Sequence, residues 1–340
     1  MKKLLAMLLA LCMVLAFAAC GTEPAEESAA PGDEQQNTDS TLDYPKQSIN
    51  VIVPKGAGGP TDTAARILLK YCQEYDSNLN FVVENVTGAN GVTGMTKGAL
   101  AENDGYTLTM IVVELGIMQN LPSYNCAVST DDFRPISICT ANTVMLCTRA
   151  GEYEDIYDFI DKMSADTKVG NSGTYGISDL GFQTAAEGWG KEYTSVPYAD
   201  GDSASIAALL ADNSEIDAIA CCASGTLTAQ VEAGALDVLC VFGDEVQSFC
   251  PDAPFLKDLE NGYAVDAVVN AWCGVAVPDD TPDDIYNYLV EVFTYATESE
   301  EFQNELYESG TVPAAINGED AQKLVDDDAA HYAEMLADAE

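Results

Sequence analysis

The stretch "VPKGAGGPTDTAAR", Val53–Arg66, directly follows the apolar run "INVIV" and leads into a segment whose apolar residues recur at helical spacing. A strand, a glycine-rich turn and a helix in this order form the first half of a β-α-β unit. Short apolar runs alternate with helical patterns in the same way from Tyr44 to the C-terminal end. Because alternating strands and helices form right-handed crossovers, the pattern predicts an α/β fold with parallel sheets covered by helices on both faces.

The glycine-rich turn matches neither of the common nucleotide-binding motifs. A Walker A loop needs a lysine after its glycines, whereas Lys55 precedes them, and the dinucleotide motif G-x-G-x-x-G fails at Thr61. The spacing alone leaves two roles open. The free N–H groups at the start of the following helix favour an anion. Alternatively, Thr61 or Asp62 only caps that helix.

A second polar loop, "GNSGTYGISDLG" (170–181), also lies between a strand-like run and a helical pattern. Ser172 and Thr174 carry hydroxyl donors, and the neighbouring glycines leave the backbone accessible. In open parallel sheets, ligands bind beyond the carboxyl ends of the strands, which is where both loops are expected. The alternative is a polar loop that only caps its helix. A catalytic serine is disfavoured because G-x-S-x-G is absent.

The charge and the residue types exclude several classes of function. The 340 residues include 14 Lys and Arg against 56 Asp and Glu, a formal net charge of −42. Binding to nucleic acid or to an anionic membrane surface is disfavoured, because both depend on basic side chains. The chain has one histidine, His331, in an acidic C-terminal segment, and no cluster with metal-ligand spacing. We therefore expect no enzyme, no cofactor and no metal site.

The N-terminal residues have the features of an export signal. Two lysines precede the apolar run "LLAMLLALCMVLAFAA", which ends in small residues before Cys20. This arrangement predicts a signal peptide at 1–19 and resembles bacterial lipoproteins, in which such a cysteine is lipidated. Residues 20–43 are then the lipidated Cys20 and a disordered polar tether, which holds the protein on the outer side of the cell membrane. Phe17 departs from the usual aliphatic residue, so ordinary secretion is the alternative.

The cysteines do not form a recognisable disulfide framework. There are eleven, and setting aside Cys12 and Cys20 leaves nine, an odd number without CxxC spacing. We expect buried free thiols, with a few disulfides as the alternative.

Several blocks of sequence occur together in an order that resembles one protein family. They are "YPKQSINVIVPKGAGGPTDTAARIL", "FVVENVTGANGVTGMTKGALAENDGYTL", "VGNSGTYGISDLG", "VPYADGDSASIAALLADNSEIDA", "CPDAPFLKDL" and "WCGVAVPDDTPDDI". From about Tyr44 to the C-terminus, the chain resembles the Bug (TctC-like) family, the extracytoplasmic solute-binding proteins of tripartite tricarboxylate transporters. Each block alone is a weak signal, whereas the ordered set is specific.

The resemblance implies a two-lobed α/β fold of the type II periplasmic-binding-protein kind, with a ligand cleft between the lobes. Residues 44–148 and 269–340 are then lobe 1, and residues 149–268 are lobe 2. It implies a receptor that captures a small carboxylate-containing solute, an organic acid or an amino acid, by cleft closure. The solute is delivered to integral membrane permease subunits. A ligand sensor for a membrane kinase and an exported enzyme acting on a small carboxylated metabolite are the alternatives.

The resemblance also implies which loops form the cleft. Members of the family hold a carboxylate with backbone N–H groups and bridging waters from two β-α loops rather than with an arginine. Matched to this sequence, the walls are Gly58, Gly59, Thr61 and Asp62 on one side, and Ser172, Gly173, Thr174 and Gly176 on the other.

Several positions depart from the family pattern. Lys55 would add a cation beside the ligand, and Glu114 follows the run "TMIVV". Asp200 and Asp202 lie in "PYADGDSAS". These three acids near a carboxylate site would raise the cost of binding a plain di- or tricarboxylate, so one of them is expected to receive an amino group of the ligand, and Glu114 and Asp200 are assigned to the ligand site. The alternative is that these acids point to solvent. Trp272 is expected in the core at the hinge rather than stacked on the ligand.

Overall fold

The structure is a computed structural model that describes residues 42–198, 201–243, 246–266 and 269–337. The predicted signal peptide, the lipidation of Cys20 and nearly all of the predicted tether fall outside these residues, as does Asp200. From Leu42 onward the chain forms one compact unit.

The glycine-rich stretch connects the first strand to the first long helix, as the sequence predicts. β1 (Ile49–Val53) is almost entirely buried. α1 (Pro60–Tyr75) begins with a proline, which fits there because the first N–H of a helix has no partner within the helix. β1 pairs in parallel with β2 (Phe81–Asn85) and with β3 (Thr107–Val112), so the turn lies at the carboxyl end of a parallel strand.

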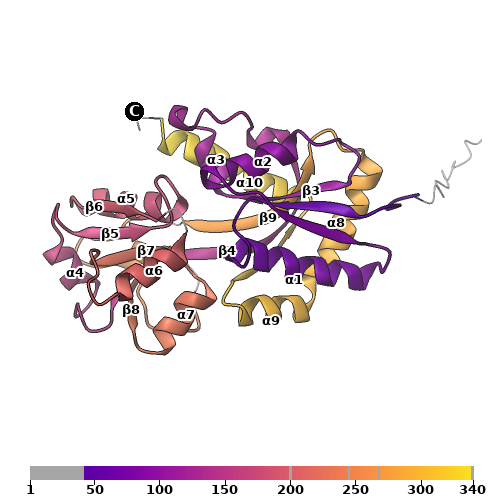
Figure 1. The fold of residues 1–340 in the computed structure, drawn as a ribbon. Coiled ribbons are helices and arrows are strands. Elements are labelled where there is room, and N and C mark those ends of the chain that lie inside the picture. Colours follow the sequence, from indigo (N-terminus) through magenta and orange to yellow (C-terminus); the bar gives the residue numbers. More distant parts are fainter. Residues whose placement is uncertain (1–41, 199–200, 244–245, 267–268, 338–340) are drawn as a thin grey trace, which may run out of the picture. The chain divides into compact units, whose positions relative to one another are not determined.

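The first of two sheet regions has the strand order β2-β1-β3-β9-β4. β9 (Asn270–Pro278) is antiparallel to β3 and to β4 (Phe133–Arg149), and β10 (Pro313–Asn317) is antiparallel to β4. Figure 1 shows this region with its helices, which are α1, α2 (Val92–Ala99), α3 (Glu114–Met118), α8 (Asp283–Glu298), α9 (Glu300–Glu308) and α10 (Glu319–Met335).

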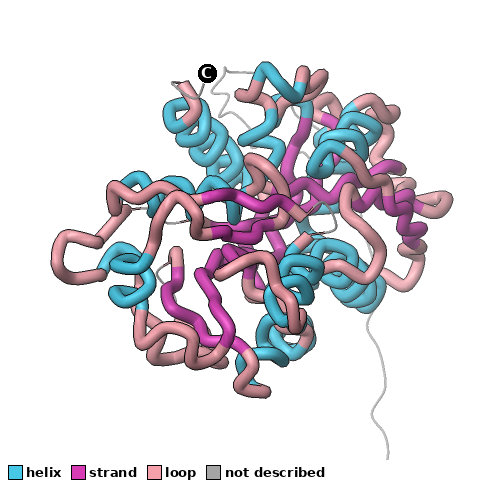
Figure 2. Tube along the Cα trace, turned by 60° about the vertical axis from the view of Figure 1, so that its left-hand side comes forward, coloured by secondary structure: helices cyan, strands magenta, loops and turns pink. Residues whose placement is uncertain are grey.

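The second sheet region continues from β4 in the order β7-β5-β6, and β8 also pairs with β4. These strands are β5 (Lys168–Asn171), β6 (Thr194–Pro197), β7 (Ala218–Cys222) and β8 (Leu236–Val241). The helices of this region are α4 (Ile156–Lys162), α5 (Ile177–Gly188), α6 (Asp202–Leu210) and α7 (Gly225–Glu232). Helices lie on both sides of the strands (Figure 2), as expected for an α/β protein.

The long strand β4 belongs to both sheet regions. It pairs with β9 from Phe133 to Thr143 and with β7 from Val144 onward. Two bulges interrupt its pairing with β9, because Ile136 and Cys139 each stand as an extra residue without a partner on β9. Its side chains are buried on both faces along most of its length.

The sheets are mixed rather than purely parallel. The β-α-β units that the sequence predicts are parallel, such as β1 with β3 and β5 with β7. β4, however, is antiparallel to each strand with which it pairs. The prediction of wholly parallel sheets is therefore wrong, because apolar periodicity indicates an extended buried segment but does not indicate its direction.

The part of the chain that the structure describes has neither a disulfide bond nor a helix that could cross a membrane. All nine cysteines in this part of the chain are free thiols, and six of them are buried. None of the helices described here combines the length and the apolar character that a membrane crossing requires.

Candidate functional site

A cavity of about 970 Å³ lies among loops of both sheet regions. It is lined from the first region by 54–61, 87–91 and 112–114, and from the second by 172–174 and 201–203. The two loops that the sequence singles out therefore meet at one cavity. Most of its lining segments follow the carboxyl end of a parallel strand, where ligands of α/β proteins bind.

Three long helices begin at this cavity without a side-chain cap. α1, α5 and α6 have glycines at their N-cap positions, and no side chain accepts a hydrogen bond from the first turn of any of them. By contrast, Asp155 and Ser299 cap α4 and α9. The uncapped first turns leave backbone N–H groups without an intrahelical acceptor and add the positive end of each helix dipole. This part of the cavity is therefore suited to an anion.

Asp62 holds the first loop by hydrogen bonds from outside the cavity lining. Its Oδ2 accepts hydrogen bonds from Gly58 N at 2.8 Å and from Arg66 Nε at 2.9 Å, and its Oδ1 accepts one from Asn85 Nδ2 at 2.9 Å. Burial opposes ionisation of Asp62, but the hydrogen bonds from Arg66, Gly58 and Asn85 hold its pKa below the usual value. The side chain is 2% exposed and lies outside the cavity lining, so its carboxylate fixes the shape of the turn.

The second loop is built in the same way around Asp179. This residue is the third of α5, as Asp62 is the third of α1, and its Oδ2 accepts a hydrogen bond from Tyr175 N, four residues earlier, at 2.9 Å. Its Oδ1 accepts one from Asn171 Nδ2 at 2.7 Å. Each wall of the cavity therefore rests on an Asp–Asn pair with a buried aspartate.

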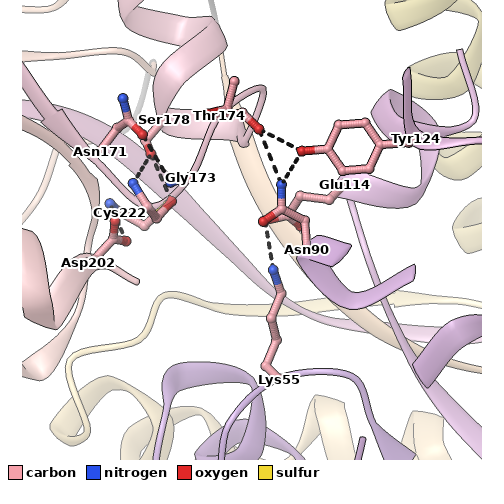
Figure 3. A network of polar contacts seen from close by, with 11 residues as sticks. Lys55, Asn90, Glu114, Tyr124, Asn171, Gly173, Thr174, Ser178, Asp202 and Cys222 are labelled. Carbon is pink, nitrogen blue, oxygen red and sulfur yellow. Dashed lines mark hydrogen bonds and ion pairs between the residues drawn. The ribbon is translucent and has the colours of Figure 1, made fainter. Parts of the chain in front are cut away.

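Ser172 and Gly173 are residues of the second loop that line the cavity. The Ser172 hydroxyl is 2.9 Å from Ser178 Oγ, and Gly173 N donates to Asn171 Oδ1 at 2.9 Å. Gly173 has φ of +136°, a backbone conformation that side chains strongly disfavour. The backbone of the loop is therefore held in one unusual shape beside the cavity (Figure 3).

Lys55 does not offer a free cation to a ligand. Its Nζ is 3.1 Å from Glu114 Oε1, and the two side chains are 31% and 12% exposed. The charges of Lys55 and Glu114, which both depart from the family pattern and lie 59 residues apart in the sequence, therefore compensate each other.

Asp202, by contrast, forms no ion pair within the described lining of the cavity. Its Oδ2 accepts a hydrogen bond from Cys222 N at 3.0 Å, while its buried Oδ1 has no hydrogen-bond partner. Burial raises the pKa of Asp202 to about 6, and the Glu114 carboxylate adds to this effect, whereas the Cys222 N–H, Lys55 and the Ser172 hydroxyl reduce it. Asp202 is largely ionised above that pH.

A small network joins the two sheet regions at the rim of the cavity. Asn90, in the 3₁₀ turn η1 (Ala89–Gly91), donates from Nδ2 to Thr174 O at 3.3 Å and to Tyr124 OH at 3.2 Å. The Tyr124 hydroxyl donates to the same Thr174 carbonyl at 3.0 Å. Asn90 and Tyr124 from the first region thus hold the second loop in place (Figure 3).

Tyr124→Phe tests this bridge because it keeps the ring and removes the O–H donor to Thr174. We expect amide hydrogen exchange in 172–176 to become about fivefold faster, which corresponds to roughly 1 kcal/mol for one hydrogen bond. Tyr307→Phe is the control, since Tyr307 is 50% exposed and does not line the cavity. Equal exchange at this loop in the two variants would show that the tyrosine does not hold it.

The structure brings most of the predicted residues to the cavity. Its lining includes Gly58, Gly59, Thr61, Glu114, Ser172, Gly173 and Thr174. Asp62 and Gly176 lie behind the two loops, and Asp200 is outside the described residues.

The structure adds Asn90 and Tyr124 to the residues around the cavity, and it shows Asp202, which the sequence analysis names without assigning it to the site, in the lining. Of the added residues, Asn90 carries a sequence signal, because an asparagine directly before a glycine favours a left-handed turn, and its φ is +54°. Trp272 is 3% exposed, and its Nε1 donates to Asp328 Oδ2, so it is a core residue that also borders the cavity.

Comparison with known proteins agrees with this architecture. The family described as "Tripartite tricarboxylate transporter family receptor" matches residues 76–339. A protein from the TAR-I ttuE-ttuC′ intergenic region of Agrobacterium vitis is 27% identical over 278 residues, which cover 80% of this chain and 78% of that protein. The periplasmic binding protein BugD superposes with a TM-score of 0.73 at 25% identity, over 87% of this chain and 98% of BugD.

A solved structure with a ligand has the same fold. MatC from Rhodopseudomonas palustris, determined with bound malate, has a TM-score of 0.73 at 21% identity, over 86% of this chain and all of the MatC chain (100%). The fold of this protein is therefore the two-lobed α/β fold of these binding proteins. The chain belongs to the tripartite tricarboxylate transporter receptor family.

Proposed function

We propose that this protein is an extracytoplasmic receptor that captures a small carboxylate-containing solute and delivers it to membrane permease subunits. The observation that carries the proposal is the convergence of three uncapped helix N-termini, those of α1, α5 and α6, on one cavity. Free N–H groups at these positions bind a carboxylate without the help of a cationic side chain. The malate held by MatC supports the same ligand class.

The side chains of the cavity support backbone recognition of the carboxylate. Within the described lining, Lys55 is the one cationic side chain, and Glu114 already pairs with it. The Cys222 thiol stays protonated, because burial and the nearby Asp202 raise its pKa well above the usual value. A protonated thiol is a poor nucleophile, which supports binding rather than covalent chemistry.

Closure of two lobes around the ligand is the proposed mechanism. We take 44–148 with 269–340 as lobe 1 and 149–268 as lobe 2, and β4, which ends at Arg149, pairs with β9 of lobe 1 and with β7 of lobe 2. A ligand drives closure only through contacts that it gains in the closed state. Loops 54–61 and 172–174 supply such contacts from opposite lobes, and the hydrogen bonds of Asn90 and Tyr124 to Thr174 reinforce the closed arrangement.

The position of the receptor in the cell follows from its N-terminal sequence. A signal peptide at 1–19, a lipid on Cys20 and a polar tether at 20–43 would keep the receptor at the outer side of the membrane, within reach of the permease. In this proposal the protein makes and breaks no bond, so it is not an enzyme.

A thermal-shift screen of mono-, di- and tricarboxylates and amino acids tests the proposed function. Binding to the native state alone stabilises it by about 2.7 kcal/mol at a ligand concentration of 100 Kd, so a true ligand raises the melting temperature in proportion to the logarithm of its concentration. The methyl ester of each hit is the control and should give no shift. Conversion of the bound compound into a product, seen by NMR, or shifts caused only by compounds without a carboxylate, would contradict the proposal.

A further inference from the structure

We propose that Asp202 determines specificity by receiving a protonated amino group of the ligand, so that the receptor selects carboxylates that also carry an ammonium group. This inference rests on the proposed function, since it names the ligand class of the same cavity. The expected ligands are zwitterions of the amino-acid type. A dicarboxylate with the same carbon skeleton and no amino group is expected to bind more weakly.

The hydrogen bonding of Asp202 is incomplete in a way that indicates a missing donor. Oδ2 accepts a hydrogen bond from Cys222 N at 3.0 Å, but the buried Oδ1 accepts none. Buried carboxylate oxygens are normally satisfied, and an exception calls for an explanation. The other unpartnered buried atoms in the described chain are hydroxyls of neutral side chains, namely Thr109, Ser137, Thr148 and Thr228. Asp202 differs from them because it is ionisable and lines the cavity.

The charge balance of the cavity leads to the same conclusion. Among the described lining residues, the charged side chains are Lys55, Glu114 and Asp202. Lys55 and Glu114 form an ion pair at 3.1 Å, so Asp202 is left as the uncompensated charge. An ammonium group would neutralise Asp202, whereas a second carboxylate on the ligand would add to the repulsion.

The position of Asp202 allows one ligand to use both kinds of contact. It is the first residue of α6, beside Gly201 and Ser203 in the lining, and it interacts with Ser172 on the loop before α5. Asp202 lines the cavity and is partly exposed, although Oδ1 itself is shielded, so in this proposal the side chain would rotate on binding to bring that oxygen to the ligand. The ligand carboxylate would then lie on the free N–H groups of the helix starts, with its amino group against Asp202.

Matched pairs of ligands provide the test. Each pair shares its skeleton and its carboxylates and differs only in the α-amino group: alanine and propionate, aspartate and succinate, glutamate and glutarate, phenylalanine and 3-phenylpropanoate. Isothermal titration of the mature protein should show at least tenfold tighter binding of the amino acid in the pair that fits the cavity. In Asp202→Asn the affinity for that amino acid should fall at least tenfold, while its deaminated partner binds as well as before or better.

Asp212→Asn is the matched control, because it removes the same charge from an exposed residue that does not line the cavity. It should keep the preference of the wild-type protein. If the deaminated acids bind the wild-type protein as tightly as the amino acids do, or if Asp202→Asn keeps the preference, the inference about Asp202 is overturned and the proposed function stands. If neither member of any pair binds and the wider carboxylate screen is also negative, the proposed function itself fails.

Discussion

Asp202→Asn is expected to stabilise the unliganded protein at pH 7.5 by about 3 kcal/mol, while it impairs the binding of amino-group ligands. Burial raises the pKa of Asp202 from 3.8 to about 6, with Glu114 adding to the shift. The folded protein therefore holds this proton more tightly than the unfolded chain does. The stabilisation that the protonated carboxyl gives to the folded state is fully present below about pH 4 and is lost as the pH rises through 6. Each unit of pKa shift corresponds to roughly 1.4 kcal/mol of unfolding free energy. Asparagine has no charge to desolvate, so the loss does not occur in the variant.

Chemical denaturation at several pH values measures this effect. The difference in unfolding free energy between Asp202→Asn and the wild-type protein should be largest at pH 7.5, shrink between pH 6 and 4, and vanish near pH 4. Asp212→Asn should show no comparable trend, since its side chain is exposed in both states. Parallel stability curves for Asp202→Asn and the wild-type protein over this range would contradict the assignment of a strained, desolvated carboxylate. A gain in stability together with a loss of discrimination is typical of a residue kept for binding.

Gly173→Ala is expected to weaken ligand binding about tenfold. A side chain at φ of +136° is strained, and an added Cβ would lie 3.1 Å from Asn90 Oδ1. Both effects push the second loop away from the bridge that Asn90 and Tyr124 form with Thr174. Backbone strain of this kind costs about 1–3 kcal/mol, and 1.4 kcal/mol corresponds to one factor of ten in affinity. Isothermal titration with the strongest compound from the thermal-shift screen gives the value.

Gly190→Ala separates the effect at the cavity from the general cost of replacing a glycine. Gly190 follows the end of α5 with φ of +64°, and a Cβ there meets no atom within 4 Å. This variant should lose some stability and keep its affinity for the ligand. If Gly173→Ala binds as well as Gly190→Ala does, the shape of the second loop does not matter for the ligand.

The sequence was sufficient for the local units of this fold and insufficient for how they are joined. The apolar run 49–53, the glycine-rich turn and the helical spacing after it predict β1 and α1 because each signal is local. β4 and β9 were not anticipated as a long antiparallel pair. Their register depends on contacts between residues more than 120 positions apart, such as Thr143 with Asn270, and periodicity carries no information on such pairing.

The candidate site shows the same division between local and distant information. Glycines and hydroxyl residues in two loops are enough to predict that both loops face a ligand. The pairing of Lys55 with Glu114 could not be predicted, since the two residues follow different strands and meet only after β1 and β3 lie side by side. Similarly, Asp62 is an obvious polar residue in sequence, but only the structure shows that Gly58, Arg66 and Asn85 already occupy its two oxygens.

The two bulges of β4 determine where this protein family can tolerate a change in chain length. Side chains of a strand alternate between its faces, so losing one residue turns the remainder of the strand over relative to its neighbours. At Ile136 or Cys139 the lost residue is one without a partner on β9, so the flanking pairs with β9 close up with their faces unchanged, and at Ile136 the hydrogen bond from Gly318 N is lost as well. Within β4, single-residue insertions and deletions among related receptors should therefore be confined to these two points.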